Sequence, residues 1–351
     1  MKGEVPMSGQ PKRVGVSDVA KRADVSIGTV SNYLNYPDRV SDTLKAKIKA
    51  AIDELGYVPR QSKASQQRAV SNGLIGYVMT DIEHSLFTDI FEGIQEVCED
   101  NDMQVIGANA SSDAVRQSEL VQMFVRIGCS GIILSTVMDS ANDVDAARAA
   151  GVRIVLVDHA APMSDVPTSC ILEDNQMVGQ MAVEELVRGG CTRLAFVAHS
   201  FDYQSVQDRY AGVRRAVERY RGTVSLELID AHGLMVEDGY EVGRELVRRI
   251  QDGREIPDGV VAASDHLGIG VIRALSDDGH LRVPDDVCVI GCEGVRISHT
   301  APVEMTTIDA PGADIGRKAM IELLDAIENP AAYVSSVTML QPRLHRRSST
   351  R

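Results

Sequence analysis

The sequence contains no tryptophan, and only 4% of its 351 residues are aromatic. A ligand site in which tryptophan stacks on a sugar ring is therefore excluded. The six cysteines are scattered, without a Cys-x-x-Cys pair or a partnered histidine, so we expect buried thiols in a reducing compartment. Because there is neither a run of about 18 apolar residues nor an apolar N-terminal segment, we expect no membrane span and no secretory signal.

Motifs that mark common catalytic sites are also missing. The chain has no Gly-x-x-x-x-Gly-Lys-Ser/Thr, no His-Glu-x-x-His and no Gly-x-Ser-x-Gly. No Gly-x-Gly-x-x-Gly follows the first predicted strand, and Gly268-Ile269-Gly270 lies inside a helical pattern. We therefore expect no enzyme, no cofactor and no metal site.

The net charge of −14 is distributed unevenly along the chain. Residues 1–70 carry 12 Lys and Arg against 7 Asp and Glu, which gives a net charge of +5. The remaining residues carry 24 Lys and Arg against 43 Asp and Glu, which gives a net charge of −19. A basic module of this size is typical of nucleic-acid binding. Phosphate would repel the acidic remainder, so we expect DNA contact to be confined to the N-terminal module.

Residues 17–35 have the pattern of two short helices joined by a tight turn. Val19, Ala20 and Ala23 supply the inner face of the first helix, and Asp24-Val25 make the turn. The Ser26 hydroxyl is placed to cap the second helix, which can pack back through Val30 and Leu34. The outer face of that helix carries short, mostly polar side chains, as a helix in a DNA major groove requires. We expect DNA contacts from Ser26, Ile27, Gly28, Thr29, Ser31, Asn32 and Asn35.

This stretch resembles the helix-turn-helix of the lac repressor-type family of bacterial transcription regulators. The matching words are Val19-Ala20, Val25-Ser26, Thr29-Val30-Ser31 and Leu34-Asn35, followed by Val40-Ser41, a third helix to about Leu55, and Gly56-Tyr57-Val58-Pro59. The resemblance extends from Val14 to about Arg343. It implies a homodimer on a paired operator, with half-sites about one helical turn apart. The C-terminal tail shows no heptads, but the sequence does not decide between dimer and tetramer.

In the family, the segment after the proline forms a hinge helix that inserts a leucine into the minor groove. This sequence departs there, because Arg60 replaces the family's asparagine and Gln66 stands at the leucine position. Arg60 and Lys63 can reach phosphates, but a glutamine amide between bases would be desolvated. We therefore expect operator binding that depends on phosphate contacts more than on bending.

From Gly73 onward, short apolar runs alternate with helical patterns, which predicts parallel sheets. Expected strands are 74–79, 104–109, 131–135, 153–157, 193–198, 225–229, 259–263, 287–291 and 305–308. Expected helices include 88–100, 174–188, 204–220, 235–251, 265–279 and 311–328. This number of strands suits two doubly wound lobes. The resemblance implies lobes of periplasmic-binding-protein type, between which the chain crosses three times.

We therefore predict an α/β protein with an N-terminal helix-turn-helix headpiece and two parallel-sheet lobes. The expected domains are 14–58 for DNA binding, 59–72 for the hinge, and 73–343 for a core that binds an effector and dimerises.

Ligands of open α/β sheets bind at the carboxyl ends of the strands, which here predicts a cleft between the lobes. Polar side chains at those ends, and an arginine early in the following helix, suit a polyol. The candidates are Asp81, His84, Phe87, Asp158, Asp174, Arg209, Ser264, Asp265 and Glu293.

The resemblance assigns Arg209 to sugar hydroxyls or phosphate, but several of the family's other sugar-binding positions differ. Ser264 replaces the usual asparagine, Glu293 the first aspartate of Gly-x-Asp-Asp, and Cys292 an aromatic. The effector cannot be named from these residues.

We predict a cytoplasmic regulator, most consistent with a repressor that a sugar or sugar-like effector controls. The alternative is a solute-binding protein, exported or cytoplasmic, with the same core and no regulatory role. The N-terminal motif distinguishes the two, because it would have no purpose in a protein that only binds a solute.

Overall fold

The structure, a computed structural model, describes residues 16–26, 28–30, 33, 40–55, 73–136, 140–160, 167–199, 201–279, 281–299, 301–309 and 312–351. The chain divides into two units, residues 1–70 and 71–351.

The first unit contains helices α1 (Val16–Ala23) and α3 (Asp42–Leu55), which pack on each other. Between them the chain turns at Asp24, whose φ of 54° lies in the left-handed region that aspartate tolerates. The predicted cap is confirmed, since the Thr29 amide donates to the Ser26 hydroxyl at 3.0 Å. The small core consists of Val19, Ala20, Ala23, Val30, Ile48 and Ala51.

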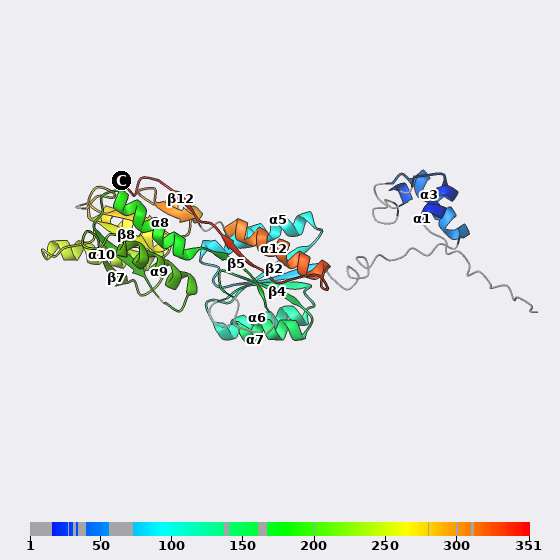
Figure 1. The fold of residues 1–351 in the computed structure, drawn as a ribbon, viewed down its shortest axis with the longest axis horizontal. Helices are drawn as coiled ribbons and strands as arrows, with labels where there is room; N and C mark the ends of the chain where they lie inside the picture. The colour runs from blue at the N-terminus through cyan, green and yellow to red at the C-terminus, as the bar shows by residue number, and fades with distance from the viewer. Residues whose placement is uncertain are drawn as a thin grey trace, which may run out of the picture. The chain divides into compact units, whose positions relative to one another are not determined.

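The first lobe of the second unit is a three-layer sandwich (Figure 1). Its six strands are all parallel, in the order β11-β5-β4-β3-β1-β2. The strands are β1 (Leu74–Met79), β2 (Gln104–Asn109), β3 (Gly131–Ser135), β4 (Arg153–Val157), β5 (Ser169–Glu173) and β11 (Val337–Leu340). Helices α5 (Ser85–Asp100) and α12 (Gly312–Glu328) cover one face, and α6 (Ala114–Arg126) and α7 (Ala141–Ala149) cover the other.

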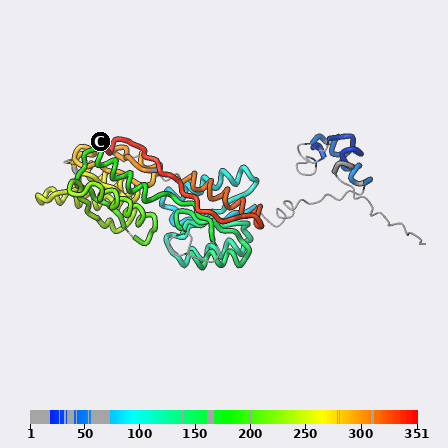
Figure 2. The backbone as a smooth tube through the Cα atoms, viewed as in Figure 1, coloured from blue at the N-terminus to red at the C-terminus, as the bar shows by residue number. Residues whose placement is uncertain are grey.

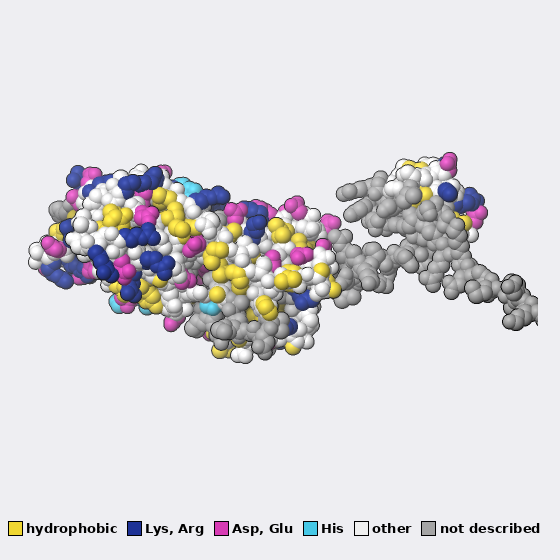
Figure 3. All heavy atoms as spheres, viewed as in Figure 1, with side chains coloured by type: hydrophobic (Ala, Val, Ile, Leu, Met, Phe, Trp, Pro, Cys, Tyr) yellow, Lys and Arg dark blue, Asp and Glu magenta, His cyan; other side chains and the backbone are white. Residues whose placement is uncertain are grey.

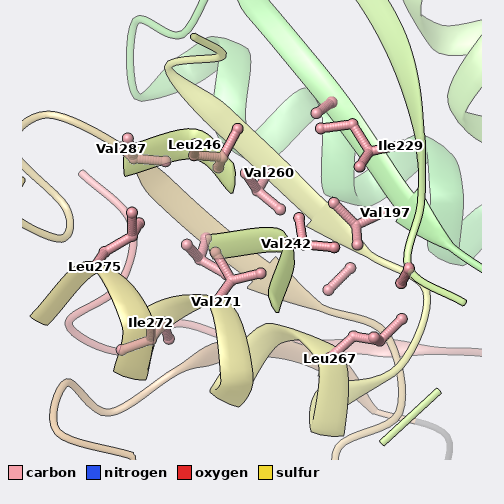
Figure 4. Packing of buried hydrophobic residues seen from close by; sticks show 14 of the residues in the cluster. Val197, Ile229, Val242, Leu246, Val260, Leu267, Val271, Ile272, Leu275 and Val287 are labelled. Atoms are coloured by element: carbon pink, nitrogen blue, oxygen red, sulfur yellow. The ribbon is translucent and has the colours of Figure 1, made fainter. Parts of the chain in front are cut away.

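The second lobe repeats this arrangement, with strand order β12-β10-β9-β8-β6-β7. Its strands are β6 (Arg193–Ala198), β7 (Ser225–Asp230), β8 (Gly259–Ala262), β9 (Cys288–Gly291), β10 (Thr306–Asp309) and the antiparallel β12 (Arg343–His345). Helices α10 (Val236–Gln251) and α11 (Asp265–Asp278) pack their aliphatic side chains on one face (Figure 4). Helices α8 (Asn175–Arg188) and α9 (Gln204–Glu218) cover the other face, and a short 3-10 helix, η2 (Arg296–His299), follows β9.

The chain passes between the lobes three times: from β5 to α8, from β10 to α12, and from β11 to β12 (Figure 2). The architecture of two doubly wound lobes is thereby confirmed, with β12 as the antiparallel exception. The nine predicted strands occur within one residue of their expected bounds. Three strands that the sequence did not predict complete the sheets: β5, β11 and β12.

The second lobe includes residues beyond the predicted end of the core at residue 343. Ser349 is fully buried, and its hydroxyl donates to the Val289 carbonyl and accepts from the Thr306 amide. Arg351 donates to the thiols of Cys191 and Cys288. The last residues of the chain are therefore part of this lobe.

Candidate functional site

A cavity of about 360 Å³ lies where the carboxyl ends of the two sheets face each other. This size suits a small ligand. Residues of the first lobe on its wall are Thr80, Asp81, His84, Leu86, Phe87, Ser112 and Asp158. The second lobe supplies His199, Tyr203, Ser205, Val206, Arg209, Gly233, Leu234, Met235, Ala263, Ser264 and Glu293. Side chains from both lobes can therefore contact one bound molecule.

Seven of the nine predicted effector residues line this cavity: Asp81, His84, Phe87, Asp158, Arg209, Ser264 and Glu293. Two do not. The Asp174 carboxylate caps α8 by accepting from the Met177 amide at 2.9 Å. Asp265 is fully buried behind the wall, where it accepts from the Glu293 and Val295 amides and from the Thr307 hydroxyl. Asp265 thus holds the loop that carries Glu293.

Arg209 lies at the centre of a buried hydrogen-bond network, although it also borders the cavity. Its Nε donates to Asn175 Oδ1 at 2.7 Å, and Nη1 donates to the Ala263 carbonyl at 2.6 Å. The guanidinium also pairs with Glu293 at 3.3 Å and Glu173 at 3.6 Å. These partners fix the guanidinium plane at the cavity wall.

Glu293 is held in its ionised form by cations on two sides. Burial alone would raise its pKa, but His84 and Arg209 outweigh that effect and lower the pKa of Glu293 to about 2. His84 Nε2 lies 3.2 Å from Glu293 Oε2. Burial lowers the pKa of His84, whereas the charge and hydrogen bond of Glu293 raise it, and the net pKa is above the ordinary value. Since His84 and Glu293 belong to different lobes, this pair links them across the cleft.

Two aspartates near Glu293 have the opposite shift. Burial, opposed only in part by Arg209, raises the pKa of Asp158 to about 6. Burial and the charge of Glu293 raise the pKa of Asp265 to about 6 as well. Two carboxyl groups that are easily protonated, one at the cavity wall and one behind it, therefore lie near one that is not.

Several direct contacts join the lobes around the cavity, and they involve residues that the sequence did not single out. The Tyr203 hydroxyl donates to Ser112 Oγ at 3.2 Å, and the Ala160 amide donates to Gln204 Oε1 at 3.1 Å. Arg296 pairs with Asp89 and Glu92 of α5, each at 2.6 Å. Ser112 and Tyr203 stand in irregular segments just before helices, where no periodic signal identifies them.

The described part of the predicted DNA-binding face is accessible. Gly28 is exposed, and a Cβ added there would have Ser26 Oγ, at 3.6 Å, as its nearest described neighbour. The Ser26 and Thr29 hydroxyls share a hydrogen bond of 2.8 Å. The remaining candidates lie outside the described residues: Ile27, Ser31, Asn32, Asn35, Arg60 and Lys63.

The visible surface of the core has mixed charge. On the face seen in Figure 3, Lys and Arg side chains are interspersed with Asp and Glu over both lobes. This face offers no continuous basic strip to a phosphate backbone.

Comparisons with known proteins agree with both units. Residues 16–60 match the model of bacterial regulatory proteins of the lacI family, and residues 183–350 match a periplasmic binding protein-like domain. The chain is 27% identical over 344 residues to the ribose operon repressor of Escherichia coli strain K12, covering 95% of this chain and 99% of that protein.

Catabolite control protein A of Priestia megaterium is 26% identical to this chain over 346 residues, which cover 96% of this chain and 99% of that protein. A solved complex of the transcriptional regulator CelR with cellobiose superimposes with a TM-score of 0.68 at 25% identity, over 96% of this chain and all of that one. Within the described part of the chain, helices of the length and apolarity that cross a membrane do not occur.

Proposed function

The chain belongs to the lacI family of bacterial regulatory proteins, and from this premise we propose that it represses transcription from an operator under the control of a small polar effector. The observation that carries the proposal is a cavity lined from two lobes in a chain that begins with a helix-turn-helix. A ligand that contacts both lobes favours one arrangement of them over another. Such a change in the core can alter how a paired headpiece meets DNA.

A sugar or sugar-like molecule fits the cavity best. Carboxylates, a guanidinium and hydroxyls on its wall can form the charge-assisted hydrogen bonds that polyols accept and donate. Phe87 and Tyr203 add apolar ring surface. The ribose operon repressor and the cellobiose-bound regulator are relatives over nearly the whole chain, and they support this class of effector.

The regulator works as a homodimer in the cytoplasm, where its operator is, and it catalyses no reaction. Residues 14–58 bind DNA, residues 59–72 are the hinge, and the core from residue 73 binds the effector and dimerises. A solute-binding role without DNA is disfavoured, because residues 16–60 match a DNA-binding family and that segment would have no purpose.

The DNA-binding part is tested at Gly28, whose exposed position accepts a side chain without a clash. The full-length protein is titrated onto DNA from upstream of its own gene in a gel-shift assay. Gly28→Asp should reduce specific binding at least about tenfold, because its carboxylate is repelled by phosphate. Gly28→Ala is the matched control and should bind as the wild type does. If Gly28→Asp, folded by circular dichroism, binds with wild-type affinity, the groove assignment is wrong.

Effector control is tested by repeating the gel shift with a panel of pentoses, hexoses and disaccharides. One of them should change operator affinity in a saturable way and should bind the protein in calorimetry. If the protein binds operator but responds to no sugar of the panel, the proposed effector class is contradicted.

A further inference from the structure

Three side chains that can ligate a metal meet beside the cleft, and two of them, His84 and Glu293, line its cavity. His84 precedes α5 in the first lobe, whereas His266 in α11 and Glu293 after β9 belong to the second lobe. One ligand atom from each lies within 4.8 Å of the other two. All three residues are buried, at 8%, 4% and 6% exposure. The group is therefore assembled by the approach of the two lobes.

The spacing of these atoms suits a shared ion. Nitrogen and oxygen atoms bound to the same zinc ion at about 2.0–2.2 Å lie roughly 3–3.5 Å apart. His84 Nε2 and Glu293 Oε2 are 3.2 Å apart. The His84 and His266 rings have centroids 4.8 Å apart, with their planes inclined by 46°. Small side-chain rotations would bring all three within coordination distance.

A hydrogen bond between His84 and Glu293 leaves part of this group unsatisfied. Nδ1 of His84 and Nδ1 of His266 are both buried and have no hydrogen-bond partner among the described residues. A buried polar atom without a partner is unfavourable, and native structures rarely tolerate two side by side. Two buried imidazole rings with incomplete hydrogen bonding, next to a carboxylate, point to a bound cation, which would displace the proton that His84 shares with Glu293.

The charge around the group also favours a cation. Glu173 and Glu293 pair with the guanidinium of Arg209. Asp265 donates its amide to Glu293 and Asp158 lines the same cavity, so carboxyl groups outnumber guanidinium groups in this part of the described structure. Mixed imidazole and carboxylate ligands are those of zinc and similar divalent transition metals, whereas calcium and magnesium prefer oxygen alone.

We propose that His84, His266 and Glu293 bind one divalent transition-metal ion of the zinc class, which bridges the two lobes. This inference rests on the proposed function, because it assigns the ion to the effector cleft. Two histidines and one glutamate leave a coordination position open. His84 and Glu293 line the cavity of about 360 Å³, so a hydroxyl of a small ligand in that cavity can complete the coordination. The ion stabilises the arrangement of lobes that brings its ligands together.

The test is calorimetric titration of the metal-free, full-length protein with Zn²⁺. The wild type should bind one ion per chain. His84→Gln, which removes the ligand of the first lobe, and His266→Gln, which removes one from the second, should each weaken binding at least about tenfold. His232→Asn is the matched control, since that side chain is 86% exposed and its φ of 62° suits asparagine. It should bind as the wild type does.

Cobalt provides an independent readout, because its visible absorption reports coordination by nitrogen and oxygen. The wild type and His232→Asn should acquire this absorption with Co²⁺, and both cleft variants should lose it. Wild-type affinity in His266→Gln, with folding shown by circular dichroism, would overturn the site. Wild-type affinity in His84→Gln alone would show that the ion sits on one lobe and would overturn the bridge.

Failure of this inference and failure of the proposed function give different results. If metal-free protein binds operator and sugar but no stoichiometric Zn²⁺, only the metal site is wrong. If Zn²⁺ binds as described but neither DNA nor any sugar does, the metal site stands and the regulatory proposal fails.

Discussion

Arg209 illustrates how a residue at a ligand site can also be part of the buried framework. The strand-and-helix pattern identified it only as a group that can face an effector. In the structure it has four protein partners, Asn175, Ala263, Glu173 and Glu293, and 2% exposure. Any change at this position therefore affects stability as well as binding.

We expect Arg209→Ala to lower the free energy of unfolding of the core by about 3–5 kcal/mol, because two buried carboxylates, on Glu173 and Glu293, each lose an ion pair. Denaturant unfolding followed by far-ultraviolet circular dichroism measures this change. Arg215→Ala, an exposed position of the same helix, should differ from the wild type by less than about 0.5 kcal/mol. A loss below about 1 kcal/mol in Arg209→Ala would show that the network contributes little.

Asp158 gives a prediction on pH. Its pKa is raised from 3.8 to about 6, so the folded state binds more protons than the unfolded state between these values. Stability contributed by this group is therefore lost as pH rises through that window. Asp158→Asn should raise the free energy of unfolding at pH 7 by about 1–2 kcal/mol, and the gain should vanish below about pH 4.

Asp102→Asn is the control for that measurement, since Asp102 is exposed and has a similar φ of 55°, against 58° at Asp158. The free energy of unfolding of Asp102→Asn should equal that of the wild type at each pH. A gain in Asp158→Asn that is the same at pH 4 and pH 7 would argue against titration of the carboxyl group.

The site residues that closely follow a predicted strand could be identified from the sequence. Asp81, Asp158, Ser264 and Glu293 follow buried strands closely, and all four line the cavity. Tyr203, by contrast, lies in a loop whose path depends on packing between the lobes. His84, His266 and Glu293 are far apart in sequence, so no spacing motif signals their approach. The proposed metal site therefore differs from the expectation, drawn from the sequence, of no metal.

Three helix pairs of the core are built on the same close contact. Each helix contributes a glycine where the backbones meet: Gly93 and Gly316 in α5 and α12, Gly179 and Gly212 in α8 and α9, Gly239 and Gly270 in α10 and α11. A Cβ at any of these would lie 2.0–2.1 Å from a carbonyl oxygen of the partner helix. Backbone on both sides leaves no flexible side chain to give way.

The α8–α9 contact is next to the cleft, because the carbonyl oxygen that a Cβ at Gly179 would meet, at 2.0 Å, belongs to Arg209. Gly179→Ala should force the helices apart and lower the free energy of unfolding by about 1–3 kcal/mol. It should also weaken effector binding, since Asn175 and Arg209 are held across this contact.

Gly28→Ala is the glycine control for stability, as its added Cβ meets only ordinary contact and alanine favours a helix. Unchanged unfolding of Gly179→Ala would mean that the two backbones are not in contact.

Strands that are apolar runs in the sequence were predicted, whereas β11 and β12, which are not, were missed. Central strands such as β3 and β8 are continuous apolar runs buried on both faces. Strand β11 is an edge strand whose side chains alternate in exposure over only four residues, and β12 has three residues. Their positions in the sheets depend on where the chain crosses between the lobes near its C-terminal end. That crossing is determined by contacts between residues distant in sequence.

The whole molecule separates its charge between its two units. The N-terminal 70 residues have a net charge of +5 and the rest −19. In the core, many charges are paired within a lobe or across the cleft, as Arg296 is with Asp89 and Glu92. Only the first unit is thus suited to displace counterions from DNA.

This separation predicts which lysines determine the salt dependence of operator binding. Each phosphate contact contributes about one unit to the slope of log affinity against log salt. Lys63 belongs to the segment that follows the headpiece in sequence and, with Gln66 in place of an apolar wedge, we expect it to contact phosphate. Lys63→Ala should therefore reduce the slope by about one unit and weaken binding similarly on specific and unrelated DNA. Lys318→Ala, an exposed lysine of α12 in the core, should leave the slope unchanged. An equal effect of both substitutions would show that the acidic core also contacts DNA.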